Sequence, residues 1–305
     1  MLARRALPRL QQCHRLVPFL YIRLYSTTKL SNGITLAYDL HEPAKKAERG
    51  LRDLRENAPP IVFLHGLFGS KKNNRSMTRD LNRPVYALDL RNHGDSSHDP
   101  RHDYNALAED LELFLQHHKL TRPTLIGHSM GAKTVMTLAL RNRVPIANLI
   151  PIDNAPVDAA LHRDFIKYTQ GMRKIDETTI HRQSDADAIL KDYEESISIR
   201  QFLLGNLVRQ PDGTQKWQIP IKILTNALDN MADFPFKDPE EARWEGPVLV
   251  VRGTKSHYVA DEMLPVLGRF FPKFELADVE SGHWVTSEKP EEFRKAVVEW
   301  LQDKE

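Results

Sequence analysis

The sequence GHSMG at 127–131 places one serine between two glycines. A serine hydroxyl acts as a nucleophile when a sharp strand-to-helix turn presents it and a base removes its proton. The surroundings fit such a turn, because an apolar strand pattern at 124–126 precedes the motif and a helical pattern at 132–141 follows it. We therefore predict that Ser129 is a catalytic nucleophile, against the simpler alternative of a surface serine after a glycine-bounded strand.

A nucleophilic serine needs a histidine base, and His283 is the best placed of the 13 histidines. It lies in ESGHW at 280–284, after an apolar pattern at 274–279 and before the final helical pattern. A base that comes late in the chain, after the nucleophile, matches one known order of catalytic triads. His257 also follows a strand pattern and remains a minor alternative.

The same chemistry needs backbone N–H groups directed at the negative charge that develops on the substrate oxygen. The segment HGLFG at 65–69 follows the apolar pattern at 61–64 and is the expected source of one donor. We predict the N–H groups of Leu67 and Met130 as the oxyanion hole, with Phe68 as an alternative donor. A plain glycine-containing turn would leave the same sequence signal.

Length and composition describe an ordinary globular chain. The chain has 305 residues, 43 Lys and Arg against 41 Asp and Glu, 41 % hydrophobic residues and one cysteine, which excludes disulfide-rich, collagen-like and wholly disordered classes. A formal charge of +2 gives no sign of nucleic-acid binding. No metal or nucleotide motif suggests a cofactor, and no stretch of about 20 apolar residues suggests a membrane span. Lys71 and Lys72 are interpreted as solvated surface charge.

The N-terminus differs from the rest of the chain. The first acidic residue is Asp39, whereas residues 1–25 contain five arginines among apolar residues. An arginine-rich, acid-free, amphipathic start is typical of a mitochondrial presequence, and RLYS at 23–26 is similar to a matrix-protease site. We predict a presequence at 1–25 and a mature domain at 26–305 in the mitochondrial matrix. Its removal would take away the single cysteine, Cys13, and change the formal charge from +2 to −3.

Alternating strand and helix patterns predict the architecture. Near-continuous apolar runs are typical of parallel strands buried on both faces, and helical patterns separate them, so we expect an α/β fold with a mostly parallel central sheet. The runs lie at 34–38, 61–64, 85–88, 124–126, 148–152, 248–251 and 274–279. Residues of about 156–243 contain helical patterns and no convincing strand. We interpret this stretch as a helical lid insertion over the sheet.

Several segments together resemble the α/β-hydrolase superfamily, and more narrowly the mitochondrial abhydrolase domain-containing protein 11 group with its fungal relatives, including yeast ethanol acetyltransferase. They are HGLFGS (65–70), ALDLRNHGDSS (87–97), GHSMGAK (127–133), IDNAPVD (152–158), VRGTKSHYV (251–259) and SGHW (281–284). The resemblance covers about residues 30–302. It implies an α/β-hydrolase fold and acyl-transfer chemistry.

The acid of the triad holds the histidine in the correct tautomer. Most members of the superfamily carry it in the loop after the strand that is predicted here at 248–251, where this chain has Ser256. The resembled group implies Asp153 instead, at the end of the predicted strand 148–152 and 24 residues after Ser129. We predict Asp153, keep Asp261 as the alternative acid, and expect Ser256 to be a supporting hydrogen-bond partner.

These residues predict a serine hydrolase that cleaves small-molecule carboxylic esters or thioesters through an acyl-enzyme. The resemblance to ethanol acetyltransferase implies an alternative, in which an alcohol replaces water as the acyl acceptor. A second alternative is a non-catalytic mitochondrial protein that binds another protein, whose identity the sequence does not indicate. Substrate, acyl chain length and oligomeric state also stay open.

Overall fold

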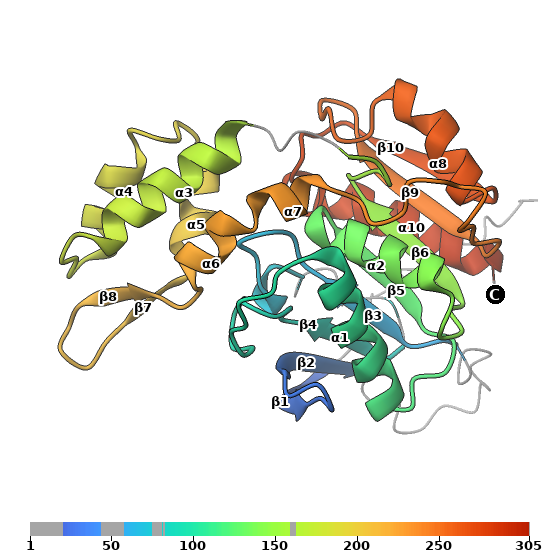
Figure 1. Ribbon diagram of the computed structural model, residues 1–305, viewed down its shortest axis with the longest axis horizontal. Coiled ribbons are helices and arrows are strands. Elements are labelled where there is room, and N and C mark those ends of the chain that lie inside the picture. The colour runs from blue at the N-terminus through green and yellow to red at the C-terminus, as the bar shows by residue number, and fades with distance from the viewer. Residues whose placement is uncertain (1–20, 44–57, 75–80, 82, 159–162, 305) are drawn as a thin grey trace, which may run out of the picture.

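A computed structural model describes residues 21–43, 58–74, 81, 83–158 and 163–304. Its centre is an eight-stranded sheet of order β1-β2-β4-β3-β5-β6-β9-β10 (Figure 1). β2 pairs antiparallel with both β1 and β4, and the neighbours from β4 to β10 pair in parallel. The strands are β1 (Tyr21–Lys29), β2 (Thr35–Pro43), β3 (Ile61–Leu64), β4 (Val85–Leu88), β5 (Thr124–His128), β6 (Asn148–Ile152), β9 (Val248–Gly253) and β10 (Phe274–Val279).

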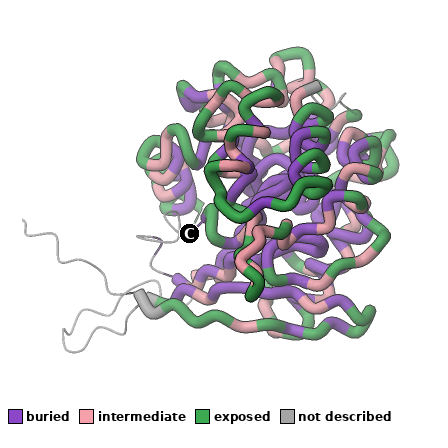
Figure 2. The backbone as a smooth tube through the Cα atoms, turned by 90° about the vertical axis from the view of Figure 1, so that its left-hand side faces the viewer, coloured by how far each residue is buried: buried purple, intermediate pink, exposed green. Residues whose placement is uncertain are grey.

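Helices cover both faces of this sheet, and the central strands lie inside (Figures 1 and 2). Alternate residues of one strand belong to two different cores: Val62 packs in the core that includes α1 (Tyr104–His117) and α2 (Met130–Arg141), whereas Phe63 packs in the core that includes α10 (Pro290–Lys304). Burial on both faces explains the continuous apolar runs. The predicted α/β fold with a mostly parallel sheet is confirmed. The remaining helices outside the insertion are η1 (Lys71–Asn74), η2 (Asp261–Met263), α8 (Leu264–Phe270) and α9 (Val285–Glu288).

The predicted N-terminal presequence overlaps the first strand of the structure. Residues 1–20 lie outside the described part of the chain, but residues 21–25, which we assigned to the presequence, are the first five residues of β1. Arg23 donates from Nε and Nη2 to the carboxylate of Asp39 on β2, at 2.9 and 3.1 Å. The pattern at 34–38 therefore belongs to the second strand of the fold, because β1 precedes it.

The segment after β6 that we interpreted as an insertion lies to the left of the sheet in Figure 1 and is mainly helical in its described part. Our expectation of no strand there was wrong, because β7 (Leu207–Arg209) and β8 (Gln215–Trp217) form an antiparallel hairpin. Each strand has only three residues, too few for a periodic signal, although the Pro-Asp-Gly sequence at 211–213 is a turn signal. The helices are α3 (Arg163–Asp176), α4 (Gln183–Leu190), α5 (Ile197–Leu204), α6 (Ile221–Asn226) and α7 (Leu228–Ala232).

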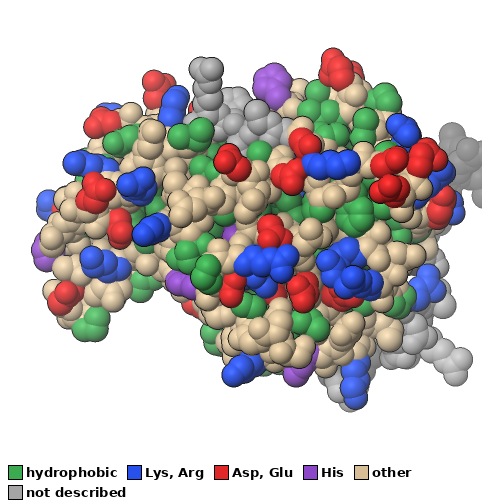
Figure 3. Space-filling view, in the orientation of Figure 1, with side chains coloured by type: hydrophobic (Ala, Val, Ile, Leu, Met, Phe, Trp, Pro, Cys, Tyr) green, Lys and Arg blue, Asp and Glu red, His purple; other side chains and the backbone are tan. Residues whose placement is uncertain are grey.

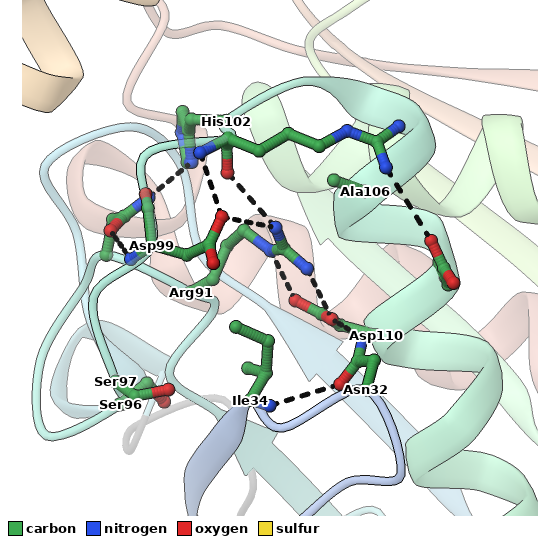
Figure 4. A network of polar contacts seen from close by, with 12 residues as sticks. Asn32, Ile34, Arg91, Ser96, Ser97, Asp99, His102, Ala106 and Asp110 are labelled. Atoms are coloured by element: carbon green, nitrogen blue, oxygen red, sulfur yellow. Dashed lines mark hydrogen bonds and ion pairs between the residues drawn. The ribbon is translucent and has the colours of Figure 1, made fainter.

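A buried ion pair joins the loop after β4 to α1 (Figure 4). Arg91 donates from Nε and Nη2 to the two carboxylate oxygens of Asp110, each at 2.6 Å. Asn32, in the turn between β1 and β2, donates to Asp110 at 2.8 Å. Bidentate geometry fixes direction as well as distance. The loop is thereby anchored beside the sheet edge where the candidate site lies.

On the face drawn in Figure 3, acidic and basic side chains are intermixed, and neither charge dominates the surface. Among the helices of the described part of the chain, none has the length and apolar character needed to cross a membrane.

Candidate active site

Ser129 lies in a strained turn between β5 and α2. Its backbone has φ 54° and ψ −111°, a conformation that costs a residue with a Cβ atom about 1–3 kcal/mol and that the surrounding structure must enforce. The Ser129 N–H group donates to the carbonyl of Ile152, the last residue of β6, at 2.9 Å. The turn also brings backbones very close together: a Cβ atom at Gly127 would lie 2.2 Å from the Gly131 oxygen, and one at Gly131 would lie 2.8 Å from the His65 oxygen. Both positions therefore require glycine.

The three side chains predicted as nucleophile, base and acid lie in one hydrogen-bonded row. His283 Nε2 is 2.9 Å from Ser129 Oγ, and His283 Nδ1 is 2.7 Å from Asp153 Oδ2. Because an ionised carboxylate only accepts hydrogen bonds, Nδ1 carries the imidazole proton and Nε2 is left to accept from the serine hydroxyl. This arrangement can deprotonate Ser129 as the hydroxyl attacks.

Asp153 follows β6 directly and is fully buried. Its N–H group donates to Val251 on β9 at 2.8 Å, which extends the sheet pairing by one residue. Its carboxylate accepts from Gly253 N–H at 3.0 Å and from Ser256 Oγ at 2.5 Å, in addition to His283. These donors hold the carboxylate in one orientation. Ser256 therefore lies where we expected a supporting partner.

The alternative acid and the alternative base lie elsewhere. Asp261 pairs with Arg252 at 2.5 Å, and its side chain is 81 % exposed. It starts η2, and its carboxylate accepts from Arg252 and not from His283. His257 is exposed, whereas His283 holds hydrogen bonds to both other members of the row.

The two predicted oxyanion donors line the pocket that contains Ser129. Leu67 lies in the loop after β3, and Met130 is the first residue of α2, where N–H groups have no partner within the helix. The expectation of Phe68 as an alternative donor was wrong, because its N–H group already donates to His93 Nε2 at 3.1 Å. Leu67 and Met130 are thus the pair that the geometry favours.

His128, the residue before Ser129 in the GHSMG motif, was not singled out by the sequence analysis. Its Nε2 is 2.7 Å from the carbonyl oxygen of His283. Burial lowers the pKa of His128 to about 4, so the ring is neutral at pH 7 and Nε2–H is the donor to that carbonyl. The residue before the nucleophile therefore holds the backbone of the base. In the sequence, only the position of His128 next to Ser129 could have indicated this role, because the contact joins residues 155 positions apart.

The pocket at Ser129 has a cavity volume of about 20 Å³, room for about one water molecule. This volume is far below that of typical small-molecule sites, about 300–1,000 Å³. Phe165 and Met231, both from the insertion, form part of its wall, as do Tyr104, Asn154 and Tyr258. The insertion therefore limits the size of the acyl group. No group of three or more potential metal ligands occurs in the described part of the chain.

Comparison with known proteins gives a consistent result. Residues 59–290 match the model of the alpha/beta hydrolase fold family. A probable alcohol acetyltransferase of Saccharomyces cerevisiae is 37 % identical over 296 residues, which cover 88 % of this chain and 84 % of the relative. The sn-1-specific diacylglycerol lipase ABHD11 of Xenopus laevis is 36 % identical, with 90 % and 86 % of the two chains covered.

Among solved structures, a marine microorganism esterase superposes with a TM-score of 0.77 at 29 % sequence identity. The match covers 87 % of this chain and 98 % of the esterase. The sequence resemblance stated above is therefore confirmed at the level of fold and relatives.

Proposed function

Since the chain belongs to the alpha/beta hydrolase fold family, we propose that it is a serine hydrolase of small carboxylic esters or thioesters that works through Ser129, His283 and Asp153. The observation that carries the proposal is the continuous hydrogen-bonded row from Ser129 Oγ to the buried Asp153 carboxylate. Relatives named as a lipase and as alcohol acetyltransferases support acyl chemistry, as does the esterase among the structural neighbours.

The reaction starts when Ser129 Oγ attacks the substrate carbonyl and its proton passes to His283 Nε2. The carbonyl oxygen becomes an oxyanion, which accepts hydrogen bonds from the N–H groups of Leu67 and Met130. The intermediate then collapses to an acyl-enzyme, and the leaving alcohol or thiol takes the proton from His283. Asp153 stabilises the imidazolium that exists between these two proton transfers.

Release of the acyl group repeats these steps with an acceptor in place of the serine. Water gives a carboxylic acid, and an alcohol gives a new ester. The relatives named as alcohol acetyltransferases favour the second outcome, whereas the diacylglycerol lipase and the esterase favour the first. We propose hydrolysis as the principal activity and alcohol transfer as the alternative.

The test uses the protein from Ser26 onward and the full chain, with p-nitrophenyl acetate, butyrate and octanoate, each with and without ethanol. We expect a burst and turnover that Ser129→Ala abolishes, with the short esters preferred because the pocket is small. Ethyl ester formation would assign the protein as an acyltransferase. If neither protein shows Ser129-dependent turnover or reacts with a fluorophosphonate probe, the enzyme proposal is wrong and protein binding becomes the better hypothesis.

The cellular location is a separate part of the proposal. The arginine-rich, acid-free N-terminus supports import into the mitochondrial matrix. A cut after Tyr25 would remove Arg23 from the fully buried Asp39, so processing there must be compatible with a shortened β1. Fractionation of cells that express the tagged full chain, with sequencing of the mature N-terminus, tests both points. A full-length, cytosolic protein would contradict them.

A further inference from the structure

Lys133 is a buried cation one helical turn after the nucleophile. Its side chain is 1 % exposed, and Nζ donates to the carbonyl oxygens of Ala232 at 3.0 Å and Asp233 at 2.9 Å, at the end of α7. In Figure 1, α7 lies beside the N-terminal end of α2. No carboxylate lies within ion-pair distance of Nζ among the residues that the structure describes. Lysine is almost never fully buried without a pairing partner, so this position needs an explanation.

The nearest acidic side chains are already engaged. Asp158 and Asp233 both bind the ammonium group of Lys237, and Asp158 also accepts from the N–H group of Phe234 at 2.8 Å. Burial lowers the pKa of Lys133 to about 8, so the group is still mostly charged at pH 7. An ammonium group has three N–H donors, and the two carbonyls use two of them. One donor remains, and the charge has an aromatic face beside it, because Nζ lies 5.5 Å from the centre of the Tyr104 ring.

The lysine belongs to the wall of the reaction site. Lys133 lines the same pocket as Ser129 and Met130, and it is the only charged side chain among the described residues of that wall. Asn154 lines the pocket as well, with its oxygen occupied by Ala155 N–H at 2.9 Å, so its NH2 group is available as a second donor. A pocket with a cation, an amide donor and no acidic residue is complementary to an anion.

We propose that the substrate carries a carboxylate a few bonds from its reactive carbonyl, and that Lys133 binds this carboxylate. The inference rests on the proposed function and specifies its substrate class. Lys133 is four residues after Ser129 and lines the same pocket, so we expect a short chain, such as a succinyl or glutaryl group. The carboxylate supplies the direct ion-pair partner that Lys133 lacks among the described residues. It belongs either to the acyl group or to the leaving group.

Matched substrate pairs distinguish these two sources. The acyl pair is p-nitrophenyl hemiglutarate against p-nitrophenyl valerate, which have the same chain length. The leaving-group pair is 4-acetoxybenzoate against 4-acetoxybenzamide. We expect kcat/KM to be at least tenfold higher for the anionic member of one pair, and the pair that shows the preference identifies the source. Equal values in both pairs would overturn the proposal.

Lys133→Met removes the charge and keeps most of the side-chain volume. It should abolish the preference by slowing the anionic substrate at least tenfold while the neutral one changes little. The matched control is Lys222→Met on α6, an exposed lysine of the insertion, which should keep the preference. If Lys133→Met slows both members equally, Lys133 only holds α7 in place and the proposal is wrong. Lys133→Gln provides a second variant if the methionine protein does not fold.

A binding measurement tests this inference independently of the proposed catalysis. Calorimetry with Ser129→Ala measures the affinity for monomethyl glutarate and for methyl valerate, without any turnover. At least tenfold tighter binding of the anion, lost when Lys133→Met is added, supports the proposal even if the wild-type protein hydrolyses no ester. Equal affinity would reject it even if the Ser129-dependent esterase activity is found.

Discussion

The imidazole of His283 stacks on the ring of Tyr258, with 4.0 Å between the ring centroids and 27° between the planes. Tyr258 N–H also donates to Ser256 Oγ at 3.2 Å, and that hydroxyl donates to Asp153. One short segment of the chain thus contacts the acid through Ser256 and the base through Tyr258. The hydrogen bonds of His283 act in the plane of its ring, and the stacked ring restricts movement out of that plane.

Tyr258→Leu should lower kcat about tenfold with little change in KM, because a stacked aromatic pair is worth about 0.5–1.5 kcal/mol and the base would lose its alignment. Tyr258→Phe keeps the ring and should retain most of the activity. Steady-state kinetics with p-nitrophenyl acetate checks both variants. Equal losses in the two variants would show that the phenol oxygen matters and not the stacking.

Asp153→Asn should reduce kcat about 10⁴-fold, because the amide would stabilise the wrong tautomer of His283 and not the imidazolium. Asp261→Asn, at the exposed pair with Arg252, should stay within about twofold of wild type. The same kinetic assay compares these two variants. A large loss in Asp261→Asn with normal activity in Asp153→Asn would reverse our assignment of the acid.

Gly131→Ala should destabilise the protein by about 1–3 kcal/mol and reduce activity, since its Cβ would lie 2.8 Å from backbone oxygens of Leu64 and His65. Neither backbone can shift without moving the loop that carries Leu67. Gly268→Ala on α8 is the control, because its Cβ would meet only the ring of Phe274 at 3.3 Å. Urea unfolding should separate the two variants, and equal free energies of unfolding would contradict the close approach.

Stability should fall as the pH drops from about 6.5 to 4.5. Burial lowers the pKa of His65 to about 4, of His102 to about 3 and of His128 to about 4. In this range the unfolded chain binds protons at these residues and the folded chain does not, so each contributes a slope of about 1.4 kcal/mol per pH unit. The stabilisation is complete above pH 6.5.

Urea unfolding between pH 4.5 and 7.5 measures this slope. His102→Gln removes one of the three buried imidazoles and should make the slope smaller than in the wild-type protein. A free energy of unfolding that does not change over this range, or a variant with the full slope, would show that these histidines take up protons in the folded state.

Local sequence determined much of the fold. Continuous apolar runs identified the strands at 61–64, 85–88 and 148–152 with their observed bounds, because a strand buried on both faces has few polar residues. The edge strand at 274–279 was also predicted with its observed bounds, although only Val279 of it is buried. The glycines and serine of 127–131 identified the turn because few other residues tolerate it. The short strands β7 and β8 and the edge strand β1 have no such pattern.

Tertiary structure alone decided which distant side chains meet. Lys71 was interpreted as solvated charge from its neighbours in the chain, yet it is 1 % exposed and pairs with Asp89 on the far side of a loop. The contacts of His283 with His128 and Tyr258, and the burial of Lys133 against α7, likewise depend on loops that meet at one sheet edge. The sequence by itself determined the chemical types available, since a nucleophile and a base have recognisable local settings. The orientation of these residues and the charge of the pocket depend on long-range packing, which produces no periodic pattern in the sequence.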